Sequence, residues 1–127
     1  AEYKKAAFYL RMNRLPKQVP AADLQATERA YAVLGKPLQR IKFRTGEKDF
    51  IGYFRTLSTL GSSNKKPPVL VILGGLDNLK TEMIRHSDYF MGRGFATLIV
   101  ENPDTGENPL GFRPESSAML GRTVSSQ

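Results

Sequence analysis

Two continuous apolar runs, separated by an amphipathic stretch, stand out in the hydrophobic pattern of the chain. The runs are PVLVILGG at 68–75 and FATLIV at 95–100. Uninterrupted apolar runs are typical of parallel strands that are buried on both faces. Between them, apolar residues recur at helical spacing over 78–91, which predicts a helix. The pattern therefore predicts a strand–helix–strand unit over 69–101 with a right-handed crossover.

The expected helix over 78–91 is flanked by residues that commonly start and stop helices. Asp77 or Asn78 can cap its amino end, because a short polar side chain accepts hydrogen bonds from the unpaired amides there. Gly92 or Gly94 can close its carboxyl end. One side of the helix would present Leu79, Met83 and Phe90, with Lys80, Glu82 and Arg85 elsewhere.

Upstream of the first buried run, the pattern predicts an antiparallel hairpin. In segment 38–44, Ile41 and Phe43 share one face and basic residues the other, as in a half-buried strand. Segment 50–56 is rich in aromatic and β-branched residues and is the second strand. The intervening TGEKD suits a turn, and the polar residues 58–66 indicate an exposed loop.

Near the amino end, apolar residues at helical spacing indicate two helices, over 2–15 and 21–34. Prolines separate them, because proline lacks an amide hydrogen and disfavours helical geometry in the residue before it. Gly35 supplies a cap for the second helix. The apolar positions of that helix are Leu24, Ala30, Tyr31 and Leu34.

Length and composition suit one domain with a modest core. The 127 residues include no cysteine, which excludes a disulfide framework and a thiolate metal site. We expect a helical segment over 1–36, followed by an α/β portion over 37–127. After Glu101 the stretch at 102–117 is turn-forming throughout.

The formal charge of +7 is unevenly distributed along the chain. Residues 1–40 carry +5, residues 41–68 carry +4 and residues 69–127 carry −2. A basic half can attract nucleic acid, but these basic residues are dispersed, without an RNA-binding aromatic signature or zinc-finger spacing. A solvated helical face explains them more simply, so a nucleic-acid partner is unlikely.

No part of the sequence suggests insertion into or passage through a membrane. The longest apolar run, at 67–73, is far below the roughly 20 residues that span a bilayer. The first ten residues lack the apolar core and cleavage site of a secretory signal. We therefore expect a cytoplasmic protein without a membrane partner.

The turn at Gly74–Asp77 is the place where chemistry is most plausible. It joins the carboxyl end of a buried strand to a helix, where ligands collect in open α/β sheets. Two glycines let the backbone approach a bound atom closely, and amides there can stabilise an oxyanion if a second donor comes from elsewhere. A tight turn without a ligand remains the simpler interpretation of the glycine pair alone. Neither phosphate-loop pattern for nucleotides is present.

A longer motif string resembles one group of α/β-hydrolases. PVLVILGGLDNLKTE, followed by RGFATLIVENPDTGE, is similar to 2,6-dihydroxypseudooxynicotine hydrolase, the fermentation–respiration switch protein and fungal polyketide-shortening hydrolases. Members carry Gly-Gly-Leu-Asp/Glu-Ser-x-Lys, then Arg-Gly, an apolar strand and Asp-x-Pro-Gly-x-Gly-Glu. They also begin with a helical region and a strand pair ending as Gly52–Arg55 does here. The resemblance implies the amino-terminal part of an α/β-hydrolase sheet, a hairpin followed by a parallel βαβ unit and preceded by a helical segment.

Three positions depart from the pattern of that group. Asn78 stands where serine is usual, Glu101 replaces the aspartate and Asp104 replaces the first glycine. Aspartate tolerates a left-handed backbone better than most residues, so a loop of altered shape is expected. The pattern cannot be followed beyond Glu107.

A serine nucleophile of the α/β-hydrolase type is missing from the sequence. G-x-S-x-G does not occur, although this fold uses it ahead of an acid and a histidine. The one histidine, His86, lies in the expected helix and does not match the late catalytic histidine. We therefore expect nucleophile, acid and base beyond Gln127. The residues assigned here are the backbone donors Gly75 and Leu76 of an oxyanion hole, with Gly74 and Asp77 supporting the turn, and no metal or cofactor.

Two functions of different classes follow from these features. The first is a serine α/β-hydrolase acting on a small carbonyl substrate, at an ester, a thioester or a carbon–carbon bond beside a carbonyl. In that case the 127 residues supply half of an oxyanion hole and are inactive alone. The alternative is a non-catalytic interaction or scaffold protein on a truncated hydrolase fold, whose open sheet edge would pair with a second copy or another chain.

Overall fold

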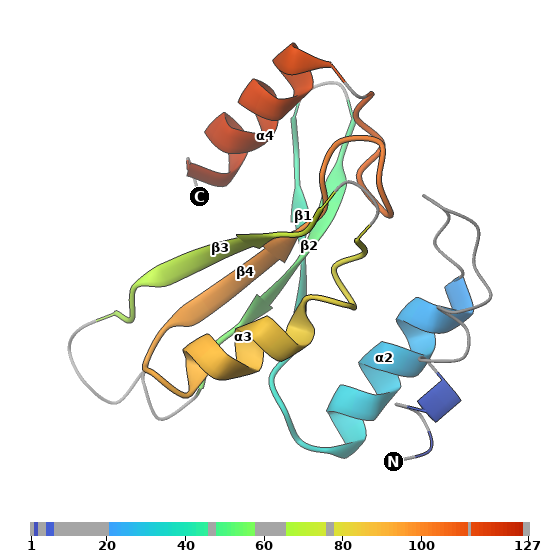
Figure 1. Cartoon of the computed structure of the whole chain (residues 1–127), viewed down its shortest axis with the longest axis vertical. Coiled ribbons are helices and arrows are strands. Elements are labelled where there is room, and N and C mark those ends of the chain that lie inside the picture. Colours follow the sequence, from blue (N-terminus) through green and yellow to red (C-terminus); the bar gives the residue numbers. More distant parts are fainter. Residues whose placement is uncertain are drawn as a thin grey trace.

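A four-stranded mixed sheet forms the centre of the molecule, with helices on both of its faces (Figure 1). This computed structural model describes residues 2, 5, 6, 21–45, 48–57, 66–75, 78–111 and 113–125. The strand order is β1-β2-β4-β3. Within the described ranges, no helix is long and apolar enough to cross a membrane.

The predicted hairpin is confirmed. Strands β1 (Gln39–Phe43) and β2 (Phe50–Arg55) pair antiparallel. Phe43 lies opposite Phe50, and their rings stack with centroids 5.0 Å apart. Both rings are buried, so the aromatic pair fixes the register of the hairpin at its closed end.

The predicted strand–helix–strand unit is also confirmed, with a later helix start. Strand β3 (Val69–Leu73) pairs parallel with β4 (Ala96–Val100), and α3 (Ile84–Met91) connects them. The prediction of a helix from residue 78 was wrong, because residues 80–83 form turns and Met83 precedes the helix without a side-chain cap. Gly94 has φ +87° and supplies the left-handed position just after the helix, as expected.

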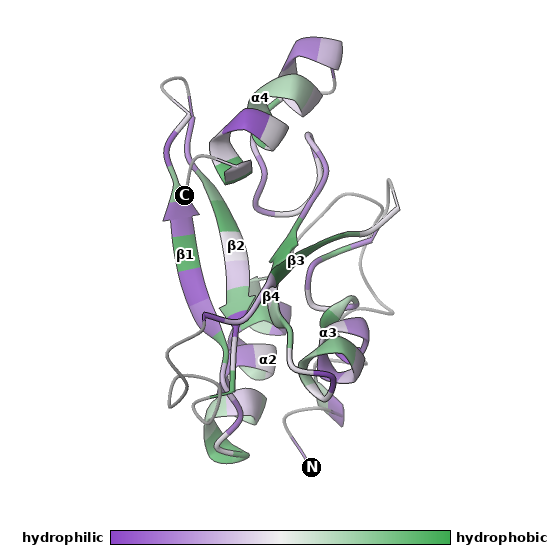
Figure 2. Ribbon diagram, turned by 90° about the vertical axis from the view of Figure 1, so that its left-hand side faces the viewer, coloured by the Kyte–Doolittle hydropathy of each residue, from purple (hydrophilic) through white to green (hydrophobic). Residues whose placement is uncertain are grey.

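Burial differs sharply between the two parallel strands. Every residue of β4 is buried, as predicted for a central strand. In β3 the prediction of burial on both faces was wrong: only Ile72 is buried, because the alternate residues Val69, Val71 and Leu73 share the sheet face of α4, which this helix covers only in part. Val69, Val71 and Leu73 are 55%, 40% and 48% exposed. Figure 2 shows this apolar strand at the margin of the sheet.

Helix α2 (Ala21–Val33) and α3 cover one face of the sheet. Gly35, at φ +60°, ends α2 as predicted. Leu34 is 44% exposed, so its prediction as an apolar-face residue was wrong. The core on this face contains Leu24, Ala30, Tyr31, Tyr53, Ile72, Ile84 and Ile99. The helix predicted over 2–15 lies outside the described residues except for 2, 5 and 6.

The opposite face carries a helix that the sequence patterns did not predict. Helix α4 (Pro114–Ser125) packs Leu120 against a second core with Phe43, Phe50, Leu98, Val100 and Leu110. The turn-forming prediction over 102–117 was therefore wrong from residue 114 onward, while residues 102–111 are irregular as expected. Between α4 and this face of the sheet lies a groove of about 620 Å³, lined by residues of all four strands that include Ile41, Val69 and Val71, and by Val124 of α4.

A buried arginine ties the two helices of the first face to the sheet. Arg55 is 1% exposed, and its guanidinium lies 4.9 Å from the centre of the Tyr31 ring. It donates hydrogen bonds to the carbonyls of Pro37 (2.9 Å) and Ile84 (3.2 Å), the Ser87 hydroxyl (2.9 Å) and the Asp88 carboxylate (2.8 Å). One side chain of β2 thus holds the segment after α2 and the first turns of α3.

Candidate functional site

The Gly-Gly turn lies at the carboxyl end of β3, beside the carboxyl end of β4. Leu73 and Val100, the last residues of the two strands, are paired in the parallel ladder. Gly74 and Gly75 follow directly. A Cβ atom on Gly74 would lie 2.6 Å from the Cβ of Asn78, so the turn is too tight for a larger residue there.

Asn78 closes the turn on itself. Its Oδ1 accepts a hydrogen bond from the Gly75 amide at 2.9 Å, and its own amide donates to the Gly75 carbonyl at 3.1 Å. Such reciprocal bonds satisfy backbone groups that a helix start otherwise leaves open. Asn78 therefore caps the turn rather than α3, which begins at Ile84.

A second asparagine reaches the same turn from the neighbouring strand. The Nδ2 of Asn102, two residues after the end of β4, donates to the Gly74 carbonyl at 2.8 Å and to the Gly75 carbonyl at 3.3 Å. The loops that follow β3 and β4 are thereby joined at the carboxyl ends of the two strands.

A largely buried charge cluster is formed by Lys80, which follows the turn, with Glu101 and Glu107. The Lys80 Nζ is 3.0 Å from Glu101 Oε2 and 2.6 Å from Glu107 Oε2. The Lys80 and Glu101 side chains are fully buried. Glu101 also accepts hydrogen bonds from the amides of Lys80 (3.1 Å) and Glu107 (2.8 Å). Lys80, expected away from the side of Leu79, Met83 and Phe90, is thus buried among charged partners.

The cluster continues outward to α2 and β1. Glu107 pairs with Arg40 at 2.8 Å, and Arg40 pairs with Glu28 at 2.7 Å. The Tyr53 hydroxyl donates to Glu28 at 3.0 Å, and Lys80 lies over the Tyr53 ring. Burial, with the nearby Glu28 carboxylate, raises the pKa of Tyr53 well above its usual range. The hydrogen bond to Glu107 likewise raises the pKa of Arg40, so both groups hold their protons.

Acidification is expected to destabilise the fold through Glu107. Burial by itself would raise the pKa of Glu107, but hydrogen bonds from Arg40 and Lys80 and their charges outweigh burial and lower the pKa below its usual range. A lowered folded-state pKa gives stability that is present above the unfolded pKa and is lost as pH falls through the folded value. When the denaturation midpoint is measured at a series of pH values from 6 down to 3, it should fall with pH for the natural chain and fall less for Glu107→Gln.

The control for that series is Glu115→Gln, which removes an exposed carboxylate of α4. It should keep the pH dependence of the natural chain. If the midpoint of Glu107→Gln fell with pH as steeply as that of the natural chain, Glu107 would not be the cause of the acid destabilisation.

The loop after β4 is shaped around the Glu101 carboxylate. Asp104 and Gly106 have φ values of +60° and +56°, so the predicted left-handed position of Asp104 is confirmed. A Cβ on Gly106 would overlap the Glu101 carboxylate. Thr105 and Asn108 form an isolated bridge across the loop, and Asn108 donates to the Glu101 carbonyl at 2.8 Å.

Gly106→Ala is expected to lower the free energy of unfolding by about 1–3 kcal/mol, the cost of a strained backbone position. The alanine would sit at a positive φ and press on Glu101. Urea denaturation checks this, with Gly121→Ala in α4 as control, because no atom lies within 4 Å of a Cβ there. Equal stability of the Gly106→Ala variant and the natural chain would contradict this account of the loop.

The structure describes part of the site that the sequence predicted. Gly74 and Gly75 lie at the carboxyl end of β3, whereas Leu76 and Asp77 fall outside the described residues. His86 is exposed on α3. Asp88, two residues later on the same helix, binds Arg55. No pattern in the sequence predicted that Lys80, Glu101 and Glu107 come together, or that Asn102 contacts the turn.

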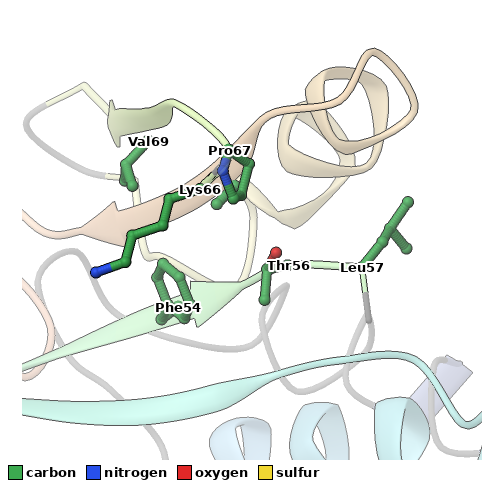
Figure 3. Close-up of a pocket in the computed structure, with 7 residues that line it drawn as sticks. Phe54, Thr56, Leu57, Lys66, Pro67 and Val69 are labelled. Atoms are coloured by element: carbon green, nitrogen blue, oxygen red, sulfur yellow. The ribbon is translucent and has the colours of Figure 1, made fainter. Parts of the chain in front are cut away.

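The described residues also offer a small pocket away from this turn. Figure 3 shows Phe54, Thr56, Leu57, Lys66, Pro67 and Val69 around a volume of about 370 Å³. It lies at the amino ends of β3 and β4, opposite the Gly-Gly turn. Among the residues described, no group of three or more acidic, histidine or cysteine side chains could hold a metal ion.

Comparison with known proteins gives consistent matches. A family model described as Esterase FrsA-like matches residues 1–126. Esterase FrsA of Vibrio cholerae serotype O1 is 28% identical over 120 residues, which cover 94% of this chain and 28% of that protein. The same esterase from another strain, M66-2, gives the same values. The chain thus spans little more than a quarter of these relatives.

Two solved structures share the fold. AbyA5 Wildtype has a TM-score of 0.75 at 21% identity, covering 98% of this chain and 36% of that one. A second AbyA5 structure has a TM-score of 0.70 at 24% identity, with 98% and 38% covered. The similarity extends over the whole sheet and its helices, and the fold corresponds to the amino-terminal part of an α/β-hydrolase.

Proposed function

The chain belongs to the FrsA-like esterase family, and from this membership we propose that it forms the oxyanion-hole portion of a serine α/β-hydrolase. The observation that carries the proposal is the Gly74-Gly75 turn at the carboxyl end of β3. It is compact, glycine-bearing and held by hydrogen bonds from two loops. Ligands in open α/β sheets bind at this end of the strands.

In the proposed reaction, a serine oxygen attacks the carbonyl carbon of an ester, a thioester or a ketone next to the bond to be cleaved. The serine proton passes to a base, and the electron pair of the carbonyl double bond moves onto its oxygen. Backbone amides stabilise this oxyanion because they are already oriented when the charge develops. One amide would come from this turn and the other from the residue after the serine.

Of the two assigned donors, Leu76 is the one that we propose to meet the oxyanion. The Gly75 amide already donates to Asn78 Oδ1 at 2.9 Å, so an oxyanion would have to displace that oxygen. The Gly75 amide then stabilises the turn through Asn78. Nucleophile, acid and base would lie in a part of the hydrolase beyond Gln127.

The mass of the intact natural protein tests this proposal first, and fluorophosphonate labelling tests it second. A mass well above that of 127 residues, with a labelled serine outside this stretch, is the expected result. The 127-residue chain alone should stay unlabelled. An intact mass equal to 127 residues would exclude a serine triad within this chain.

A second candidate function rests on a different observation, the exposed edge strand β3. An apolar, uncharged edge pairs readily with another strand, which would suit a scaffold protein that binds a second copy or another chain. Sedimentation analysis helps to distinguish the scaffold from the hydrolase. A natural protein of 127 residues that forms dimers and is not labelled by the fluorophosphonate would favour the scaffold.

A further inference from the structure

We propose that Asn102 is a positioning residue for the oxyanion-hole turn, an inference that rests on the proposed function. Asn102 comes from the loop after β4, while the turn follows β3. Its Nδ2 lies 2.8 Å from the Gly74 carbonyl oxygen and 3.3 Å from that of Gly75. The side chain therefore reaches from the loop after β4 to the turn after the neighbouring strand β3 and holds two successive peptide groups.

Because peptide units are planar, a side chain that holds a carbonyl group also orients the amide of the same peptide unit. In a trans peptide the N–H points away from the C=O of the same unit. The carbonyl of Gly74 belongs to the peptide that contains the Gly75 amide, and the carbonyl of Gly75 belongs to the next peptide. Fixing both carbonyls with one donor group therefore fixes the direction of both amides that were assigned to the oxyanion.

Asn102 itself is firmly anchored by its neighbours. The preceding residue, Glu101, is 1% exposed, and its side chain accepts hydrogen bonds from Lys80 and from the Glu107 amide. The Glu101 carbonyl accepts a further bond from Asn108 at 2.8 Å. The buried charge cluster thus holds the backbone from which Asn102 extends.

The chemistry of the side chain also matters at this position. Asn102 presents a neutral donor to two carbonyl oxygens, and each carbonyl can accept more than one hydrogen bond. An aspartate of almost the same shape would present only acceptors and would repel the carbonyls. Asn102→Asp therefore removes the contact while changing little of the volume, and Asn102→Ala removes it without adding charge.

The test compares turnover with binding of a transition-state analogue in the full-length hydrolase. A trifluoromethyl ketone forms a tetrahedral oxyanion with the serine and so reports on the oxyanion hole. Loss of one oriented donor typically costs about 100-fold in kcat, so a misaimed one should cost roughly 10- to 100-fold in both variants. KM should change less than about twofold, and affinity for the ketone should fall in step with kcat.

Pro109→Ala is the matched control, because Pro109 is exposed in the same loop. It should keep kcat and ketone affinity. Loss of thermal stability in the Asn102 variants with unchanged kcat and ketone affinity would overturn the positioning role and leave the hydrolase intact. A natural full-length protein that neither hydrolyses esters nor binds the ketone would overturn the proposed function and this inference together.

Discussion

Replacing Lys80 by alanine is expected to lower the free energy of unfolding by about 3–5 kcal/mol, because one partner of a buried ion pair then remains unpaired. The Lys80 and Glu101 side chains are both fully buried, with Nζ and Oε2 3.0 Å apart. In the variant, the Glu101 carboxylate would keep only backbone donors. Urea denaturation of the natural and altered chains at pH 7 measures the loss.

Two comparisons make this expectation sharp. Lys42→Ala removes an exposed lysine that lies 2.8 Å from Asp49, and surface pairs of this kind contribute less than about 1 kcal/mol. The double variant Lys80→Met with Glu101→Gln should lose less than the sum of its single changes, since neither side chain then carries charge. Additive losses within about 0.5 kcal/mol would contradict direct coupling of the pair.

Arg55→Ala is expected to destabilise the protein by about 3–4 kcal/mol, through lost charge-assisted hydrogen bonds and lost packing. The side chain donates to four acceptors and is 1% exposed. Without it, the Ser87 hydroxyl and the Ile84 carbonyl lose their buried cationic donor. A loss of this size should lower Tm by roughly 10 °C, as measured by thermal denaturation.

Arg55→Lys should recover only part of that loss, because an ammonium group cannot present the planar fork of donors that guanidinium offers. Arg93→Ala is the matched control. Its guanidinium also lies over an aromatic ring, that of Tyr89 at 3.5 Å, but Arg93 is exposed on the surface. If Arg55→Ala and Arg93→Ala lowered Tm equally, the burial of Arg55 would add nothing to its contribution to stability.

The elements predicted correctly are those whose local pattern agrees with their place in the sheet. In β1 and β2, alternating residues and the Phe43–Phe50 pair define the hairpin locally. In contrast, VLVIL of β3 has the composition of a central strand. Its alternate residues Val69, Val71 and Leu73 are exposed because α4 leaves part of that sheet face uncovered, and a local pattern contains no information about what covers a face.

Two helices show how tertiary contacts override local pattern. Helix α3 starts late because the side chains of residues 80 and 81 make tertiary contacts instead of continuing a helix. Lys80 binds Glu101, and Thr81 donates a hydrogen bond to the buried Asp23. Helix α4 was missed because Pro114, its serines and Gly121 resemble a loop. Its apolar signal, Leu120 and Val124 at helical spacing, occupies less than half of the helix.

The site was predictable in its backbone and not in its side chains. Glycines after an apolar strand indicate a turn at the functional end of a sheet, which located Gly74 and Gly75. Charged residues near a predicted helix are normally solvated, so nothing in the local sequence indicated that Lys80 is buried. Asn102, in a stretch of turn-forming residues, gave no sign of reaching the Gly-Gly turn until β3 and β4 were placed side by side.

The two margins of the sheet have opposite consequences for handling the protein. At β1, Arg40 and Lys42 place positive charge along the outer strand, which discourages pairing with further chains. Strand β3 has no charged residue and exposes three large aliphatic side chains. At high concentration, the folded 127-residue chain should therefore aggregate through β3 before it unfolds. Added denaturant, or a solubilising fusion near β3, should then raise its solubility more than changes elsewhere on the surface.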